Sequence, residues 1–167
     1  MSPEAAVEKW VREFVVGYSL CPFAAQPLRE GRVRFTTCEE ADPEAITRQF
    51  LSEVLLLSEH DAETLETSLI VYSKAWKDFE EFLAFIDLCE ELLVAAEADE
   101  LVQLAHFHPD YRFAGVAADD PGNLTNRSPY SCLQLIRVAS VAQARNQYAD
   151  IEKIPERNVA LMRERFS

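Results

Sequence analysis

The sequence lacks most of the short motifs that identify a reaction. It has no GxGxxG fingerprint, no phosphate-binding P-loop and no GxSxG nucleophile elbow, so nucleotide-binding and serine-hydrolase functions lack their usual support. Only four of the 167 residues are glycine, which argues against a glycine-rich phosphate cradle. The four cysteines form no CxxC pair and no zinc-ribbon spacing.

Long apolar runs are also absent, since no stretch approaches the roughly 20 residues of a membrane span. The N-terminal residues Ser2 to Ala5 do not combine a basic region with an apolar core, so we expect no secretory signal. These two absences predict a soluble, cytoplasmic protein without a membrane partner. Its cysteines are then reduced by default.

Positive charge is scarce in one part of the chain. Residues 39–100 contain eighteen acidic and three basic residues, a balance of −15, whereas residues 1–38 and 101–167 are each +1. A strongly acidic chain without a basic stripe is a poor candidate for nucleic-acid binding, because phosphate contacts dominate that affinity. We interpret the acidic block as solvated helix faces, and the near-neutral flanks remain able to accept an anionic ligand.

Helical and strand patterns alternate along the chain, which predicts crossover connections. We therefore expect a single α/β domain over 1–167, with a small, mostly parallel sheet of three to four strands packed with about five helices. A ferredoxin-like α+β arrangement is the alternative. Strands are expected at 32–37, 67–72 and 101–108, with 111–116 as a fourth at the edge; helices are expected at 2–20, from Asp42-Pro43 through Leu57, from Trp76 to Leu93, from Ser128-Pro129 through Val138, and from Pro155.

Two histidines lie near the carboxyl end of the third expected strand. His106 and His108 share one face by the two-residue period of a strand. Ligands collect at that end of open α/β sheets, and two such imidazoles can act in acid/base catalysis or bind a divalent metal. A metal needs a third ligand, and the candidates are Asp110, Asp119, Asp120 and Cys21, among which the spacing does not select. The alternative is that one histidine is buried and hydrogen-bonded and the other caps the strand.

The segment Asn126-Arg127-Ser128-Pro129 reads as a helix start. With Ser128 as its N-cap, the first amides of the helix would point outward unpaired, and Arg127 would stand beside them. A carboxylate or phosphate would then be bound by the amides and the guanidinium together. Alternatively, Ser128 only caps the helix and Arg127 pairs with Asp119 or Asp120.

Cys21 follows the first expected helix and is a candidate nucleophile or redox thiol. A reactive thiol needs a nearby cation, histidine or helix N-terminus. Cys21 lies instead at a helix C-terminus, where the helix dipole disfavours a thiolate. Activation would have to come from His106, His108 or Arg127 across the fold, and a cysteine that simply ends a helix is the alternative.

Three segments together resemble an uncharacterised bacterial family, domain of unknown function 1415. They are Leu20 to Ala24, His108 to Phe113 and Asn123 to Tyr130. The resemblance covers nearly the whole chain and implies a compact cytoplasmic bacterial protein, but the family has no activity to carry over. Its pattern continues after the Asn-Arg-Ser-Pro-Tyr motif with proline and later histidine, whereas this chain has Ser131 and Gln134 there.

These observations favour an enzyme that acts on a small anionic metabolite. His106 or His108 would be the general acid/base, with Cys21 as nucleophile. A metal-dependent enzyme using His106, His108 and Asp110 is one alternative. A non-catalytic module, either an anion sensor or an acidic partner for a basic protein, is another. The residues expected to bind the anion are Asn126, Arg127, Ser128, Tyr111 and Asn123.

Overall fold

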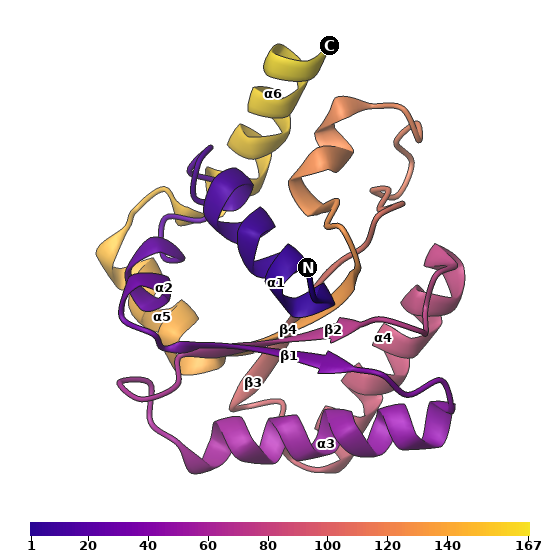
Figure 1. Ribbon diagram of the computed structural model, residues 1–167. Helices are drawn as coiled ribbons and strands as arrows, with labels where there is room; N and C mark the ends of the chain where they lie inside the picture. Colours follow the sequence, from indigo (N-terminus) through magenta and orange to yellow (C-terminus); the bar gives the residue numbers. More distant parts are fainter.

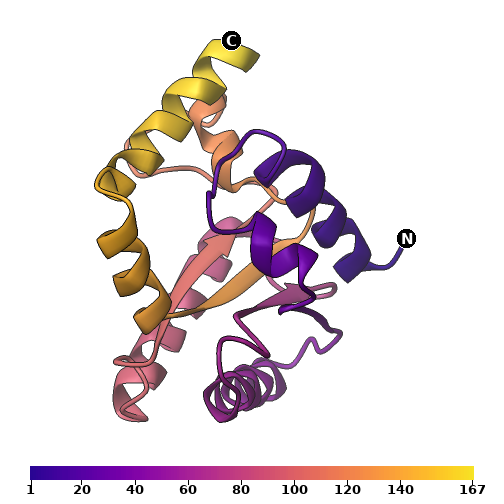
Figure 2. The ribbon, with the colours of Figure 1, turned by 90° about the vertical axis from the view of Figure 1, so that its left-hand side faces the viewer.

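The computed structural model describes residues 1–167 as one mixed α/β domain (Figures 1 and 2). Its sheet has four strands, and most of the expected helices are present. The elements are α1 (Pro3–Trp10), η1 (Val11–Val15), α2 (Ala25–Arg29), β1 (Val33–Cys38), α3 (Pro43–Glu59), β2 (Thr67–Tyr72), α4 (Phe79–Ala95), β3 (Val102–Phe107), η2 (Pro121–Asn126), β4 (Ser131–Arg137), α5 (Val138–Gln147), η3 (Ile151–Lys153) and α6 (Ile154–Phe166).

The strands lie in the order β1-β2-β4-β3. β1 and β2 pair in parallel, and β4 pairs antiparallel with both β2 and β3. It follows that β1, β2 and β3 point the same way, while β4 is inserted between two of them and runs against them. The carboxyl ends of three strands therefore meet at the edge where β4 begins. The expected crossover units are present, but only one of the three neighbouring pairs is parallel, so the prediction of a mostly parallel sheet was wrong.

The inserted strand replaces the helix that we expected after Ser128-Pro129. Segment 131–137 is extended because it lies in the middle of the sheet, where both of its faces are covered. Leu133 and Leu135 are buried on one face and Cys132 on the other, so its apolar residues do not alternate cleanly. The next helix, α5, begins only at Val138. The expected edge strand at 111–116 is a loop.

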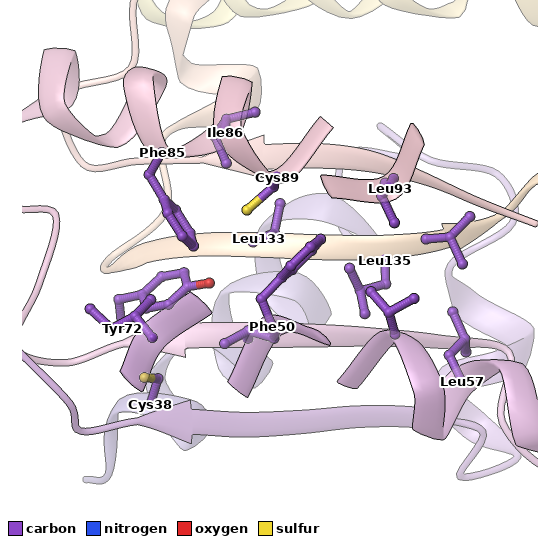
Figure 3. Packing of buried hydrophobic residues seen from close by; sticks show 14 of the residues in the cluster. Cys38, Phe50, Leu57, Tyr72, Phe85, Ile86, Cys89, Leu93, Leu133 and Leu135 are labelled. Carbon is purple, nitrogen blue, oxygen red and sulfur yellow. The ribbon is translucent and has the colours of Figure 1, made fainter. Parts of the chain in front are cut away.

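Helices cover the two faces of the sheet unequally. α3 and α4 pack on one face, and α1 packs on the other, where α2 and α6 also lie (Figure 1). The α3–α4 side holds a cluster of sixteen buried residues, against four on the α1 side. Figure 3 shows Phe50 of α3 and Cys89 of α4 meeting over the central strands. The larger core therefore fixes the positions of α3 and α4 on the sheet.

Aspartates begin both of these helices. Asp42 accepts the Ala45 amide at the start of α3, and Asp78 accepts the Glu80 amide at the start of α4. Such caps satisfy amide groups that have no partner within the helix. Trp76, which we expected inside the third helix, lies in the turn before α4. No helix in the structure combines the length and apolar content that crossing a membrane requires.

Candidate functional site

His108 is a structural residue that is fully buried, with none of its surface exposed. Its Nδ1 accepts the Asp110 amide at 2.9 Å, and its Nε2 donates to the Trp76 carbonyl at 2.8 Å. This pairing requires the neutral tautomer with hydrogen on Nε2. Both nitrogens are occupied, so His108 has none left for a metal or a substrate proton.

His106 differs from its neighbour because its ring is only half-buried and forms no hydrogen bond within the chain. Its ring packs between Phe82 and Tyr111, with centroid distances of 6.0 and 5.6 Å. Burial lowers the pKa of His106 from its usual 6.5, and the charge of Asp87 partly opposes this shift. The imidazole is therefore neutral at pH 7 and suited to accept a proton.

The anion site that we expected at Arg127 and Ser128 does not form as predicted. No helix begins at Ser128, and its buried hydroxyl donates to the Tyr130 carbonyl. Arg127 donates from Nε to the Tyr111 carbonyl at 2.9 Å and from Nη2 to the Ala118 carbonyl at 2.6 Å. The helix-amide site is absent because the chain must stay extended to enter β4.

Arg127 pairs with neither of the acidic residues proposed for it. Asp120 is instead held in a bidentate ion pair by Arg163 of α6, with both distances 3.0 Å. α6 packs against η2, so this pair ties the outside of the loop to the last helix. Arg127 therefore has only backbone carbonyls as partners.

Two asparagines complete the hydrogen-bond network of the 108–130 connection. Asn123 is fully buried; its Oδ1 accepts the Phe113 amide at 3.0 Å, and its Nδ2 donates to the Ala117 carbonyl at 2.9 Å. Asn126 donates to the carbonyl of His106 at 3.1 Å. We call His108, Asn123, Asn126 and Arg127 the polar clasp. These side chains replace backbone ladders in a loop that has none.

A pocket of about 350 Å³ opens between α4 and the segment that the clasp holds. Arg112 is the cation on its wall and forms no ion pair within the chain. Apolar side chains form most of the remaining wall, while Glu80 adds a carboxylate. We call this the α4 pocket; it is lined by Phe79, Glu80, Leu83, Tyr111, Arg112, Phe113, Ala114 and Gly115.

The α4 pocket lies next to both histidines. Tyr111 lines it and packs against His106, while Phe79 lines it and packs against His108 with centroids 5.2 Å apart. Gly115 adopts a φ of 74°, a conformation that favours glycine, where the wall turns. Of the expected ligand-binding side chains, Tyr111 alone faces this pocket, and Asn123 supports its wall.

Cys21 is separated from this site. It lies between η1 and α2, and the carbonyl of the preceding Leu20 accepts a hydrogen bond from Asn158 of α6 at 2.7 Å, whereas both histidines pack against aromatic residues of α4. The residue is exposed, yet the atoms around its sulfur shield it from water and raise the pKa of the thiol. Hydrogen bonds from the amides of Phe23 and Ala24 oppose this shift in part. The structure does not join Cys21 to His106, His108 or Arg127, so the expected activation is absent.

The expected metal ligands do not converge either. The structure contains no group of three or more His, Cys, Asp or Glu side chains arranged to hold a metal ion. Asp110 is exposed and contributes its amide, not its carboxylate, to the contact with His108. His106 therefore lacks both of the partners proposed for it.

Of the eight residues that line the α4 pocket, only Tyr111 was expected from the sequence. Phe79 and Leu83 lie within the third expected helix and were not identified as site residues. Arg112 lies in the segment His108 to Phe113, which carried the family resemblance, and its type could have marked it as an anion ligand. The pocket itself could not be foreseen, because it depends on how the loop folds back onto α4.

Comparison with known proteins identifies the family but no activity. Residues 2–166 match the family described as "Protein of unknown function (DUF1415)". No curated protein matched the chain. No solved structure matched it either. Because the family match spans almost the entire chain, the protein belongs to the DUF1415 family.

Proposed function

We propose that the protein is an enzyme that binds a small anionic metabolite in the α4 pocket. The observation that supports this most is an arginine without an ion pair, Arg112, on the same pocket wall as Tyr111, whose ring packs against the half-buried, neutral His106 just outside the lining. Apolar walls with a few polar groups are typical of small-molecule sites. The four free cysteines are consistent with a reducing cytoplasm.

Each wall of the pocket has a role in this proposal. Arg112 forms a charge-assisted hydrogen bond with a carboxylate or phosphate of the metabolite. Phe79 and Leu83 hold its apolar part. His106 packs against Tyr111 just outside the lining, and because burial keeps its imidazole neutral, it is the general base in this proposal. Glu80 disfavours a second negative charge on that side, which favours ligands with one anionic group.

The pocket wall is preformed because the clasp holds it from behind. The Phe113 amide and the Tyr111 carbonyl are both engaged by clasp side chains, Asn123 and Arg127. A wall fixed before binding lowers the entropy cost of ordering a ligand site. The clasp residues thus position the site without touching the ligand.

Binding can be tested with a library of carboxylated and phosphorylated metabolites, by thermal shift and then by NMR titration. Arg112→Gln should lose the response to a hit. Arg145→Gln is the matched control, because Arg145 is also exposed and forms no ion pair. Equal responses of the two variants would contradict the assignment of Arg112.

Catalysis is tested separately with His106→Gln. We expect this variant to bind the hit as the parent does but to lose its turnover. If the parent binds metabolites and converts none, the protein is an anion-sensing module that uses the same pocket. Unchanged turnover in His106→Gln would remove His106 from the scheme.

A further inference from the structure

A second pocket, of about 440 Å³, opens where β1 and β2 end and α3 and α4 begin. Ala41 and Pro43 form the side toward α3, and Trp76 and Glu81 form the side toward α4. Lys74 and Lys77 also line it, and we call it the lysine pocket. In α/β crossovers such a place, at the carboxyl ends of parallel strands, is where ligands collect.

The two lysines are an exception in an acidic region. Between residues 39 and 100 the basic residues number three, and the third, Arg48, is paired with Glu44 at 3.0 Å. Lys74 and Lys77 are exposed and form no ion pair. Because no partner within the chain offsets their charge, both ammonium groups are free to meet a ligand.

Two carboxylates, Asp78 and Glu81, also line the lysine pocket. Asp78 accepts the Glu80 amide at 3.0 Å as the cap of α4. Glu81, exposed on the first turn of α4, has no such role. The formal charges of the lining therefore sum to zero, but the Asp78 carboxylate is engaged at the helix start, whereas both ammonium groups are free to bind an anion.

Trp76, between the lysines, is held in an unusual conformation. Its φ is 60°, which is rare for a bulky residue. Two side chains hold its carbonyl: His108 donates at 2.8 Å and Ser131 at 2.7 Å. Strain of this kind persists only where the surroundings enforce it, and it is concentrated at functional sites.

The indole of Trp76 has an unused hydrogen-bond donor. Its ring stacks on Phe85 with centroids 4.7 Å apart, while its buried Nε1 has no hydrogen-bond partner. Buried donors in native structures are nearly always satisfied. Since this nitrogen is buried, a ligand in the lysine pocket could reach it only if the indole moved.

We propose that the lysine pocket binds the phosphate group of a small phosphorylated metabolite. A phosphate monoester carries close to two negative charges at pH 7 and three oxygen acceptors, which match the two ammonium groups that line the pocket. This site is separate from the α4 pocket, and the two lie on either side of the first turn of α4. The proposal does not depend on the function proposed for Arg112 and His106.

The test uses the intrinsic fluorescence of Trp76. The chain has two tryptophans, so Trp10→Phe leaves Trp76 as the only indole reporter. We would titrate this variant with inorganic phosphate and with phenyl phosphate, using sodium chloride at matched ionic strength as the blank. If Trp10→Phe fails to fold, the indole N–H signals of the parent in NMR spectra provide the same readout.

We expect a saturable response, and an apparent Kd at least tenfold higher in Lys74→Gln/Lys77→Gln. Lys9→Gln/Lys153→Gln removes the same charge elsewhere and should keep the affinity of the parent. Tighter binding of phenyl phosphate than of phosphate would identify an ester as the ligand, and the reverse would identify free phosphate. No saturable response, or equal weakening by both double variants, would overturn the proposal.

The Arg112→Gln variant distinguishes binding at the lysine pocket from binding at the α4 pocket in the same assay. Because Arg112 lines only the α4 pocket, this variant should bind phosphate at the lysine pocket with the parent's affinity. The lysine variants should in turn keep the response to hits at the α4 pocket. Loss of phosphate binding in Arg112→Gln would contradict a separate lysine pocket.

Discussion

The α3–α4 core and the 108–130 connection hold their shapes by different means. The core has sixteen buried residues with well-paired backbones in helices and strands. The connection has no strand and one short 3₁₀ turn, yet its path is set by four side chains that bond to backbone groups. Apolar burial stabilises a regular layer, whereas an irregular wall needs a partner for each exposed amide and carbonyl.

This difference explains where the α4 pocket lies. Its α4 side belongs to the core and its loop side to the clasp, and His108 contacts both. The imidazole packs against Phe82 of the core and hydrogen-bonds to the carbonyl of Trp76. A change in either region should therefore affect the pocket. Changes in the core and in the connection should lower the free energy of unfolding by different amounts.

The largest effect is expected in the core. Phe50 is fully buried in α3, so Phe50→Ala leaves a cavity and should reduce the free energy of unfolding by about 4 kcal/mol. Urea denaturation measures the loss. Leu51→Ala is the control, because Leu51 is 38% exposed and its truncation should cost much less stability. Similar losses in both variants would mean that the core is not packed as described.

The next effect is expected at the junction of the two regions. His108→Ala removes two hydrogen bonds and leaves a buried gap, which should cost about 3 kcal/mol. His60→Ala, at the exposed end of α3, should change stability by less than about 0.5 kcal/mol. Equal stability of the two variants would show that His108 does not hold the connection.

The sequence predicted three of the four strands closely. β2 has the expected limits of 67–72, β3 lies within its expected range, β1 is shifted by one residue to 33–38, and α3 begins after Asp42 as its cap indicates. β4 was misassigned because a strand buried on both faces loses the two-residue alternation and because Ser128-Pro129 before it reads as a helix start; β2 is also buried on both faces, but its short apolar run still indicates a strand. In β4, Leu133 and Ile136 are three residues apart and fit the helical period by chance.

The expected site and the α4 pocket share only part of their residues. The sequence placed functional groups in the 106–130 region, which forms one wall of the α4 pocket. Asn123 and Arg127 bond to backbone groups of this wall and do not line the pocket. A guanidinium or an amide side chain can bind a ligand or hold a loop equally well, and only the folded loop shows which backbone atoms it contacts.

A smaller effect should follow from a single clasp residue. Asn123→Ala removes two buried hydrogen bonds and should cost about 2 kcal/mol. Thermal denaturation against Asn146→Ala, on the exposed side of α5, provides the comparison. The clasp variant should also weaken binding at the α4 pocket. If Asn123→Ala kept the stability of the parent, packing alone would account for the shape of the 108–130 connection.

The smallest effect concerns His106 and pH. Its pKa is lowered in the folded protein, so the unfolded state binds a proton first as the pH falls. Stability from this group is present above pH 6.5 and is lost as the pH falls from about 6.5 toward the folded pKa. His106→Gln should have a flatter stability profile between pH 7 and 5.

NMR titration of the His106 ring checks the cause of this shift. Asp87→Asn should lower the pKa further, because the Asp87 carboxylate raises it. A ring that titrates above 6.5, or that rises in pKa when Asp87 is neutralised, would contradict the environment described for His106. The same ring should change its signals when a ligand fills the α4 pocket.

Native-state hydrogen exchange at the Phe113 amide tests most directly whether the clasp preforms the pocket wall. This amide donates to the buried Oδ1 of Asn123 at 3.0 Å, in a loop without a backbone ladder. We expect it to exchange as slowly as amides of β3 in the unliganded protein, and to lose protection in Asn123→Ala while β2 keeps its own. Rapid exchange of Phe113 in the parent, at the rate of an open loop, would show that the wall is not held before a ligand binds.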